Sequence, residues 1–477
     1  MEAFGAEGYA LARELLQRGV GVVYVLAFVA VVHQWRPLLG TEGLTPARTF
    51  LERVPMRSAP SVFHWRYSDR LAVGLGWVGV VLASTVVLGI PQRLGTAATV
   101  AVFGVLWLLY LSYVNIGQVW YGFGWESILL EAGFLVMLLG GHDAAVPWPT
   151  LLLLRWLLFR VEFGAGLIKL RSDPCWRELT CLDHHHETQP LPGPLSRRFH
   201  RLPTPLHRVE VATNHVTQLG LPVLLFLPQP FAGIAGLGII VTQLWLVLSG
   251  NFAWLNAITI VLATAALPDA WLTGIANLVP APPSADQTAW WFVILVGAVT
   301  VWQVVLSWEP IRNLASRQQR MNVTYNPLHL LGSYGAFGRI TRERFELIIE
   351  GTRDPDPGPD SDWAAFEFPA KPGDPARRPP LVAPYHLRLD WLLWFAAMSA
   401  TPQAGHRWFT PLLRKLLDGD RDIRRLLRHD PFDGEPPTAL RVRRYRYRFA
   451  TRDERRATGA WWTRTDVGEV TGILPRG

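Results

Sequence analysis

Cysteine and lysine are both scarce in this chain of 477 residues. Cys175 and Cys181 are the two cysteines, and this number excludes a fold held together by several disulfides. They lie six residues apart in one loop and can pair with each other if that loop faces an oxidising compartment. Lysine occurs only at positions 169, 371 and 415. Lys169 is therefore the one lysine in the apolar part of the chain.

Charged residues are also few. They make up 18% of the chain, whereas hydrophobic residues make up 50% and tryptophan contributes 22 residues. The apolar and charged residues are segregated along the chain, which is typical of a polytopic membrane protein with a soluble part attached. The net charge of +8 is not gathered into a basic cluster with a nucleic-acid-binding motif. We therefore expect membrane lipids around the apolar part and no nucleic acid partner.

The first 310 residues contain nine apolar stretches that approach the length of about 20 residues needed to cross the hydrocarbon of a bilayer. They predict a polytopic α-helical membrane bundle in residues 1–310. The count falls to seven or eight if the short stretches 125–140 and 251–267 are re-entrant. The first stretch has no small-residue cleavage site after it, so we interpret it as a membrane span and not as a signal peptide. The nine stretches are 19–35, 71–90, 97–114, 125–140, 148–170, 211–228, 232–249, 251–267 and 290–308.

Residues 311–477 have the composition of a soluble, β-rich C-terminal domain with inserted helices. Turns rich in Pro, Gly and Asp separate strand-like runs at Phe345–Gly351, Ala364–Phe368 and Tyr385–Leu389. Apolar residues at helical spacing predict helices at Asp390–Ser399 and Trp408–Leu427. The segment Leu440–Ala450 alternates arginine with Val, Tyr and Phe, which predicts a strand with one basic, solvated face.

A stripe of charge runs through the apolar segment Trp148–Leu170. Arg155, Glu162 and Lys169 recur at intervals of seven, close to two helical turns, so they project from almost the same face of a helix. A charge at bilayer depth costs a few kcal/mol even on insertion scales. The stripe must therefore face protein, and a polar site buried in the membrane bundle is the default hypothesis.

Further charges in neighbouring spans suggest a buried charge network. Glu126 and Glu131 lie in the fourth apolar stretch and Arg160 lies in the fifth. We expect Glu131 to pair with Arg155 or Arg160, because lone charges are prohibitive at this depth. Such pairs serve either to fix helix packing or to form a site for protons or a polar ligand.

Several other polar and aromatic groups have a structural interpretation. Asp183-His184-His185-His186-Glu187 resembles a metal cluster, but adjacent side chains do not converge on one ion, so we expect no metal site. His215 is expected to hydrogen-bond a loop. The aromatic group Trp120, Tyr121, Phe123 and Trp125 has the composition of an interfacial belt.

Arginine is distributed unevenly between the two sides of the predicted bundle. The loops at residues 36–70 and 171–208, which follow odd-numbered spans, hold twelve arginines, against three at Arg13, Arg18 and Arg93 on the opposite side. Taken alone, the positive-inside rule puts these loops and the C-terminal domain in the cytoplasm.

Several strings in the chain resemble the lipase maturation factor family. FGAGLIKL (163–170), CW-x-x-LTC (175–181) and ETQP-x-P (187–192) follow one another in register. GFGWESILLEAGFL (122–135) lies upstream, and NHVTQLGLPVLLFLP (214–228) and SGNFAWLNAITIV (249–261) lie downstream. In the C-terminal region, SYGAFGRITRERFELIIEGT (333–352) and PFDGEPPTALRVRRYRYRF (431–449) extend the resemblance.

The resemblance implies a multi-span protein of the endoplasmic reticulum membrane that assists folding and assembly of secreted lipases. It implies a cytosolic N-terminus, with the cysteine loop and the C-terminal domain in the lumen, which is the reverse of the arginine bias. In a bacterium the same protein would lie in the plasma membrane. By the resemblance, Arg171–Pro194 becomes the client-contacting loop, with Cys175 and Cys181 as a disulfide or redox pair. The residues we expect to contact clients are Trp176, Asp183, Glu187, Thr188, Gln189 and Pro190.

The membrane half also resembles, more distantly, the helical (HTTM-type) domain of vitamin K-dependent carboxylases. In that group a lysine in an AG-x-x-KL setting acts as the base, and Lys169 falls on that position. Two hypotheses follow. The first is a non-enzymatic folding factor without a cofactor, in which Lys169 anchors its helix by reaching water at the end of the span. The second is a membrane enzyme with Lys169 as base near a lipidic or quinone-like cofactor, tuned by Glu162 or Glu131. A transporter would require an inverted repeat, which the sequence does not display.

Overall fold

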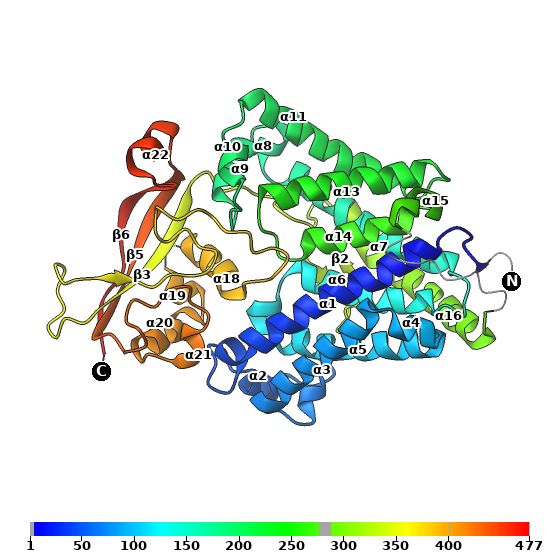
Figure 1. Ribbon diagram of the computed structural model, residues 1–477, viewed down its shortest axis with the longest axis horizontal. Helices are drawn as coiled ribbons and strands as arrows, with labels where there is room; N and C mark the ends of the chain where they lie inside the picture. Colours follow the sequence, from blue (N-terminus) through cyan, green and yellow to red (C-terminus); the bar gives the residue numbers. More distant parts are fainter. Residues whose placement is uncertain (1–3, 276–287, 400, 477) are drawn as a thin grey trace.

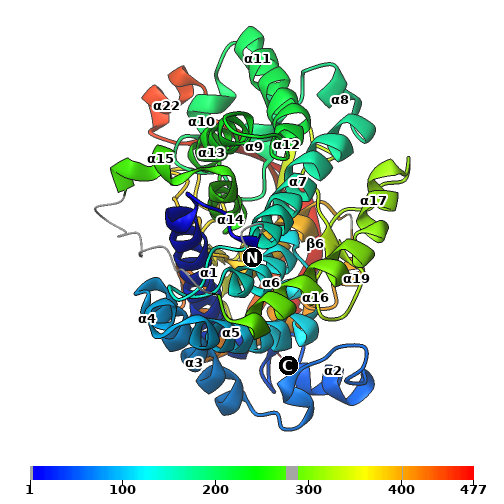
Figure 2. The ribbon, with the colours of Figure 1, turned by 90° about the vertical axis from the view of Figure 1, so that its right-hand side faces the viewer.

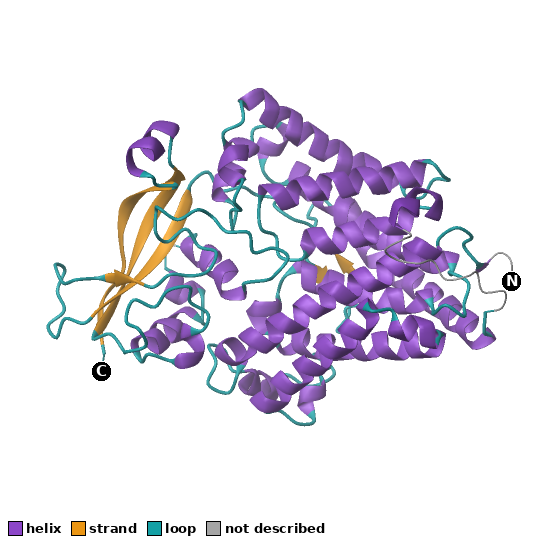
Figure 3. Ribbon diagram, viewed as in Figure 1, coloured by secondary structure: helices purple, strands orange, loops and turns teal. Residues whose placement is uncertain are grey.

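The structure is a computed structural model that describes residues 4–275, 288–399 and 401–476. Most helices run roughly along the long axis of the molecule, and the C-terminal sheet lies at one end of them (Figures 1 and 3). The first described residues lie at the opposite end of the bundle (Figure 1). The bundle therefore separates the N-terminus from the C-terminal domain.

Among the described residues, five helical segments are long and apolar enough to cross a membrane. They are α1 (Ala10–Leu39), α3 (Asp69–Val87), α5 (Thr96–Ile116), α13 (Phe231–Ser249) and the segment Trp290–Ala315, which joins α16 (Trp290–Leu306) to α17 (Trp308–Ala315). Each leaves apolar side chains exposed, such as Val81 on α3, Val241 on α13 and Val305 on α16. Exposed apolar faces on long helices suit contact with acyl chains and not with water.

The other four predicted spans depart from a plain apolar helix, so the expected count of nine spans is not confirmed. α6 (Gly124–Val136) has 13 residues and α14 (Leu255–Ala263) has nine. The stretch 211–228 is divided between α11 (Thr204–His215), a π-helical turn at Val216–Gly220 and α12 (Leu221–Leu224). α7 (Trp148–Arg171) has 24 residues but carries the charge stripe. Figure 2 shows α6, α7 and α14 towards the middle of the bundle, whereas the divided stretch leaves Val216, Val223 and Phe226 exposed.

The C-terminal region contains a four-stranded antiparallel sheet in the order β4-β3-β5-β6. The predictions near residues 345 and 440 are confirmed, because β3 covers Arg344–Thr352 and β5 covers Ala439–Phe449. The strand predicted at Ala364–Phe368 shrinks to β4 (Ala364–Ala365). β6 (Trp462–Pro475) was not predicted. Its side chains are largely exposed, so it lacks the apolar alternation that marks a half-buried strand.

The strand predicted at Tyr385–Leu389 is wrong. Tyr385 and His386 belong to a loop, and α18 (Arg388–Ala397) begins two residues later. The apolar residues that suggested a strand belong to a loop packed against the bundle and to the first turn of a helix. The helix predicted at Trp408–Leu427 is divided into α20 (Phe409–Leu417) and α21 (Arg421–Arg424). Gly419, at a φ of +69°, ends the first of these.

The expected interfacial belt is also wrong. Trp120, Tyr121, Phe123 and Trp125 are all buried. Trp120 packs against Trp408 of the C-terminal domain, with ring centroids 5.5 Å apart, and Trp125 packs against Trp391 at 4.9 Å. Aromatic composition alone cannot tell a lipid interface from a domain interface, because both favour large amphipathic rings. One hydrophobic core therefore continues from the membrane helices into the C-terminal domain.

Candidate functional site

The loop after α7 is a compact unit closed by a disulfide. Cys175 and Cys181 are bonded to each other, with their Cα atoms 4.8 Å apart. The Asp173 carboxylate accepts a 3.1 Å hydrogen bond from the Cys175 backbone N–H and so caps α8 (Pro174–Arg177). Both sulfur-bearing side chains are buried, in a cluster with Trp176, Val211 and Ile340. As expected, His215 bonds this loop, since its Nε2 lies 3.0 Å from the Trp176 carbonyl oxygen.

The histidine run lies on α9 (Leu182–Thr188), and its members point to different partners. His185 packs against Phe337, whereas His186 Nε2 lies 3.7 Å from the Glu210 carboxylate. Asp183 meets His207 at 2.8 Å. In the described residues, the one tight group of metal-ligand types is Asp173, Cys175 and Cys181. Its two sulfurs are joined in the disulfide and supply no thiolate.

The segment after α9 is clamped by Arg344 of β3. The guanidinium donates from Nη1 to the carbonyl oxygens of Gln189, at 2.5 Å, and Glu187, at 3.1 Å. It also donates from Nη2 to the Pro190 carbonyl oxygen at 3.1 Å. Arg344 is ion-paired with Glu346, whose second oxygen lies 3.0 Å from Lys371 Nζ. Arg344, Glu346 and Lys371 are all buried, so the clamp is dry and its geometry is fixed.

Further contacts join the loop to the C-terminal domain. The Trp394 indole N–H donates to the Thr188 carbonyl oxygen at 3.0 Å. The Glu187 carboxylate accepts a 2.7 Å bond from the Phe449 backbone N–H and lies 3.5 Å from His200 Nε2. Burial raises the pKa of Glu187 and lowers the pKa of His200 to about 4. The loop is therefore held by main-chain and charged contacts on both sides of its ETQP sequence.

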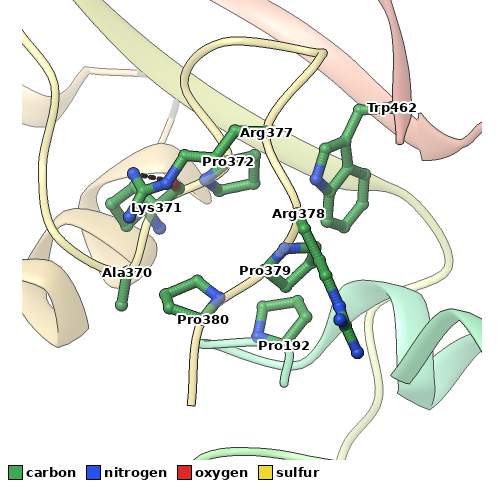
Figure 4. A pocket seen from close by; sticks show the side chains of 9 residues that line it. All are labelled: Pro192, Ala370, Lys371, Pro372, Arg377, Arg378, Pro379, Pro380 and Trp462. Carbon is green, nitrogen blue, oxygen red and sulfur yellow. Dashed lines mark hydrogen bonds between the residues drawn. The ribbon is translucent and has the colours of Figure 1, made fainter. Parts of the chain in front are cut away.

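A proline-rich seam completes this junction. One shallow pocket is lined by Pro192 of the loop, Trp462 of β6 and residues 370–372 and 377–380 (Figure 4). Asn251, which follows α13, bridges the seam by donating to the carbonyl oxygens of Pro192, at 3.2 Å, and Pro380, at 2.9 Å. Asn251 is thus hydrogen-bonded both to the disulfide loop and to the C-terminal domain.

The six residues expected to contact clients do not form one exposed surface. Trp176, Thr188, Gln189 and Pro190 are buried, and Asp183 and Glu187 are half-buried. The ETQP segment meets the chain's own C-terminal domain. The fully exposed residues of the disulfide loop are Arg171, Pro174, Arg177 and Glu178.

The acidic residues of α6 pair with arginines from other elements. Arg388, the first residue of α18, donates a 2.6 Å hydrogen bond to Glu126 Oε1, and the Tyr110 hydroxyl donates to Glu126 Oε2. Arg160 of α7 is ion-paired with Glu131, so the Glu131 partner is Arg160 and not Arg155. All four charged groups are buried. The Glu126 pair joins the membrane bundle to the C-terminal domain.

The charge stripe of α7 faces protein along its whole length, and Arg155 has partners that the other two members do not contact. Arg155 donates to the Tyr9 hydroxyl and to the carbonyl oxygens of Ala265 and Leu225, at 3.0 to 3.2 Å. Among the described residues it contacts no carboxylate. Neutral oxygens and the Trp148 ring, 4.8 Å from the guanidinium carbon, surround it instead.

Glu162 and Lys169 share one partner. The Glu162 carboxylate accepts from Gln243, at 2.6 Å, and from Gln218, at 3.2 Å. The Lys169 ammonium donates to Asn214 and to Gln218, both at 2.9 Å. Gln218 lies in the π-helical turn, a kind of distortion that is frequent where a helix must aim a side chain. One amide in this turn thus bonds both charges.

Arg344 and Arg388 hold the two halves of the molecule together, and the sequence did not single them out. Arg344 lies 155 residues from Gln189, and Arg388 lies 262 residues from Glu126. Each stands in a segment where arginine is common. The one local signal was an arginine followed at two residues by an acid, at Arg344–Glu346 and at Arg388–Asp390. On a strand this spacing puts both charges on the same face of the sheet.

Two family models match the chain. The lipase maturation factor transmembrane domain matches residues 11–274, and the lipase maturation factor C-terminal domain matches residues 330–472. No solved structure matches. The two matched regions meet at the Arg344 clamp and at the Glu126–Arg388 pair.

Curated relatives match over nearly the whole chain. Lipase maturation factor 1 of Bos taurus is 38% identical over 511 residues, covering 98% of this chain and 89% of that protein. Lipase maturation factor 1 of Homo sapiens is 38% identical and covers 96% and 87%. Lipase maturation factor 2 of Homo sapiens is 29% identical and covers 97% and 82%. The carboxylase-like alternative finds no support in these matches. With five helices in the described part of the chain long and apolar enough to cross a bilayer, this membrane protein belongs to the lipase maturation factor family.

Proposed function

We propose that the chain assists the maturation of secreted lipases by holding them on a platform formed by the disulfide loop and the C-terminal domain. The names of the relatives support a role in lipase maturation. The observation that carries the proposal is the Arg344 clamp, which fixes the loop to β3 through three backbone carbonyl oxygens. A rigid platform suits a factor that must present one shape to a client that is still folding, because little of its own conformational entropy is lost on binding.

The proposal places the platform on the lumenal side of the endoplasmic reticulum membrane, with the N-terminus in the cytosol. Two observations support this orientation. A disulfide persists in an oxidising compartment, and the loop that carries it lies on the same side as the C-terminal domain. In a bacterial cell the equivalent position is the periplasmic face of the plasma membrane.

Some of the loop arginines that oppose this orientation have structural partners. Arg197 donates two hydrogen bonds, at 2.9 and 2.7 Å, to the Ala450 carbonyl oxygen. Arg177 donates to the Leu170 carbonyl oxygen at 2.7 Å. Arginines that are required by the folded loop are a weak guide to topology.

The client contact itself is assigned to the exposed rim of the loop. Arg177 and Glu178 are exposed between the two cysteines, and Asp183 is half-buried two residues after Cys181. The loop is supported beneath this rim by four buried residues, Trp176, Thr188, Gln189 and Pro190. On this view they act on clients only through the position of the rim.

The test is rescue of lipase secretion in cells that lack their own lipase maturation factors. Wild-type chain should raise the ratio of secreted lipase activity to secreted lipase protein. The charge-reversed variant Arg177→Glu/Glu178→Arg should lower that ratio and weaken recovery of the lipase after crosslinking. The matched control is Arg48→Glu/Glu52→Arg, an exposed pair on α2 (Ala47–Arg53) at the same end of the bundle, which should behave as wild type.

Two results would overturn the proposal. One is a wild-type chain that is inserted and folded but leaves the lipase ratio unchanged. The other is equal loss in the rim variant and its control, which would mean that charge reversal at this end of the bundle acts without regard to the loop.

A further inference from the structure

A charged cavity of about 290 Å³ lies where the membrane bundle meets the C-terminal domain. Arg36 and Arg70 line it from the end of α1 and the start of α3, and Glu42 lines it from the loop after α1. From the C-terminal domain it is completed by Lys415 of α20, by Asp420, the N-cap of α21, and by Asp422 of α21. In Figure 1, α21 lies beside the end of α1. The volume is at the lower end of the range for small-molecule sites, about 300–1,000 Å³.

Some of the lining charges are already satisfied within the protein. Lys415 and Asp420 are ion-paired at 2.5 Å, and Asp422 is ion-paired with Arg425 at 3.2 Å. The Asp69 carboxylate, also in the lining, accepts from the backbone N–H and the hydroxyl of Thr41, at 2.9 to 3.1 Å, and from the Tyr67 hydroxyl at 3.0 Å. These groups form walls of fixed charge and have little capacity left for a ligand.

The remaining charged residues of the lining are Arg36, Arg70 and Glu42. Among the described residues, none of the three takes part in an ion pair, although all three line the same cavity. The cavity therefore offers two guanidinium groups and one carboxylate to a ligand. That donor set fits a small zwitterion, with an anion for the arginines and a cation for the glutamate.

Each arginine lies at the end of a helix face with exposed or half-buried apolar residues. On α3, Arg70 shares a helix face with Trp77, Val78 and Val81, which are 52%, 45% and 60% exposed. On α1, Arg36 lies fourteen residues, or about four turns, after Val22, which is 46% exposed. These faces belong to two of the helices able to cross a membrane. Their charged ends fall where the headgroup layer flanks the hydrocarbon, which accounts for about 30 Å of a 40–45 Å bilayer.

We propose that this cavity binds the headgroup of a zwitterionic phospholipid that carries a primary amine. The phosphate binds Arg36 and Arg70, the ammonium group binds Glu42, and the acyl chains lie along these faces of α1 and α3. Inorganic phosphate shares the anion, but it has neither the amine nor the acyl chains.

The test uses the purified full-length chain in detergent and a short-chain probe, dioctanoyl phosphatidylethanolamine. The lipid should bind saturably and raise the melting temperature. Arg36→Gln and Arg70→Gln should each weaken its affinity about tenfold, the loss expected for a charge-assisted hydrogen bond. Arg53→Gln, at an exposed arginine on neighbouring α2, should leave the affinity unchanged.

Competing ligands separate the possible sources of the anion. Dioctanoyl phosphatidylglycerol, which has no amine, should bind less tightly than the ethanolamine lipid, and Glu42→Gln should abolish that preference. Equal binding of the two lipids by wild type would overturn the zwitterion assignment. An equal melting-temperature rise from inorganic phosphate would overturn the lipid assignment, and absence of saturable lipid binding by folded wild type would overturn both. If an arginine variant fails to fold, the lipid preference of Glu42→Gln decides the matter.

Discussion

Arg344 on β3 donates a 2.5 Å hydrogen bond to the carbonyl oxygen of Gln189, 155 residues earlier in the chain. The same guanidinium reaches the carbonyl oxygens of Glu187 and Pro190 and pairs with the carboxylate of Glu346. One buried side chain thus fixes the segment after the disulfide loop to the central sheet of the C-terminal domain. The planar fork of arginine suits this task, because several donors of fixed geometry can serve several carbonyl oxygens at once.

Arg344→Gln should therefore detach the loop. The variant leaves Glu346 without one of its cations and three carbonyl oxygens without their donor, and we expect a loss of about 3–5 kcal/mol in the free energy of unfolding. Guanidinium denaturation in detergent measures the loss of unfolding free energy. Faster proteolysis between residues 171 and 194 would show that the loop has detached. Arg446→Gln on β5 is the control, because Arg446 forms an exposed pair with Glu343 worth at most about 1 kcal/mol. Equal losses of unfolding free energy in the two variants would contradict the conclusion that Arg344 holds the loop.

The Glu126–Arg388 pair should behave as a coupled unit across the bundle and the C-terminal domain. Glu126→Leu and Arg388→Met each leave a buried charge unpaired, so each should cost about 3–5 kcal/mol. The double variant should cost less than the sum of the two by at least about 1 kcal/mol, because it leaves neither charge unpaired. A double-mutant cycle on the unfolding free energy measures this difference. Strict additivity would show that the two side chains do not interact.

Removal of the disulfide should have a modest effect. The sequence separation of six residues closes a small loop, and loop-closure entropy of that size is worth roughly 2 kcal/mol. Cys175→Ser/Cys181→Ser should lower the unfolding free energy by this amount and expose residues 174–182 to protease. The Arg344 contacts should remain, so protection of β3 from hydrogen exchange should be unchanged. Loss of that protection would mean that the disulfide, and not the clamp, holds the loop.

Stability should fall in mild acid, partly through His200. Burial lowers the pKa of His200 to about 4, and His186 and His207 add to the effect, whereas an unfolded histidine titrates near about 6.5. Between these values the unfolded chain binds a proton that the folded chain does not. The unfolding free energy therefore decreases as the pH falls from about 6.5 to about 4.

His200→Gln should remove this contribution. Around pH 5 the slope of unfolding free energy against pH should decrease by up to about 1.4 kcal/mol per pH unit. At pH 8, where the imidazole is neutral in both states, the two curves should run parallel. An unchanged slope around pH 5 would show that His200 is not shielded from protons in the folded chain.

Lys169 should act through structure. Its ammonium donates to Asn214 and Gln218 and lies over the Trp176 ring at 4.8 Å. Lys169→Met keeps the bulk but leaves two buried oxygens without a donor, at a cost of about 1–3 kcal/mol. Lipase maturation per folded molecule should remain at the wild-type level, with fluorescence-detected chromatography giving the folded amount. Full loss of maturation at a normal folded amount would contradict a purely structural role.

Local sequence patterns were enough to predict much of the secondary structure. The apolar run of Phe345–Gly351 predicted β3, and the three- and four-residue spacing after Asp390 predicted α18, because each pattern depends on contacts made by one face of one element. The prediction at Tyr385–Leu389 was wrong for the same reason. An apolar loop that packs under a bundle has the composition of a short buried strand.

The candidate site was accessible from sequence only in part. The spacing of Arg155, Glu162 and Lys169 indicated one sheltered face of a helix, and all three side chains are buried. Their partners were not accessible, because Gln218, Gln243 and the carbonyl oxygen of Ala265 carry no charge and leave no mark in a hydropathy pattern. Glu187 and Gln189 looked like a recognition motif, but they are bound by Arg344 of the same chain.

The sequence by itself determined that this chain is a membrane protein of the lipase maturation factor family, that its charges at bilayer depth are sheltered, and that strands and inserted helices follow residue 311. These properties depend on composition, periodicity and short motifs, which are local along the chain. Only the tertiary structure decided that the ETQP segment faces inward, that the aromatic run at residues 120–125 meets Trp391 and Trp408, and that Glu126 pairs with Arg388. Those contacts join residues more than a hundred positions apart, and which of many arginines meets which carboxylate depends on how the whole bundle packs.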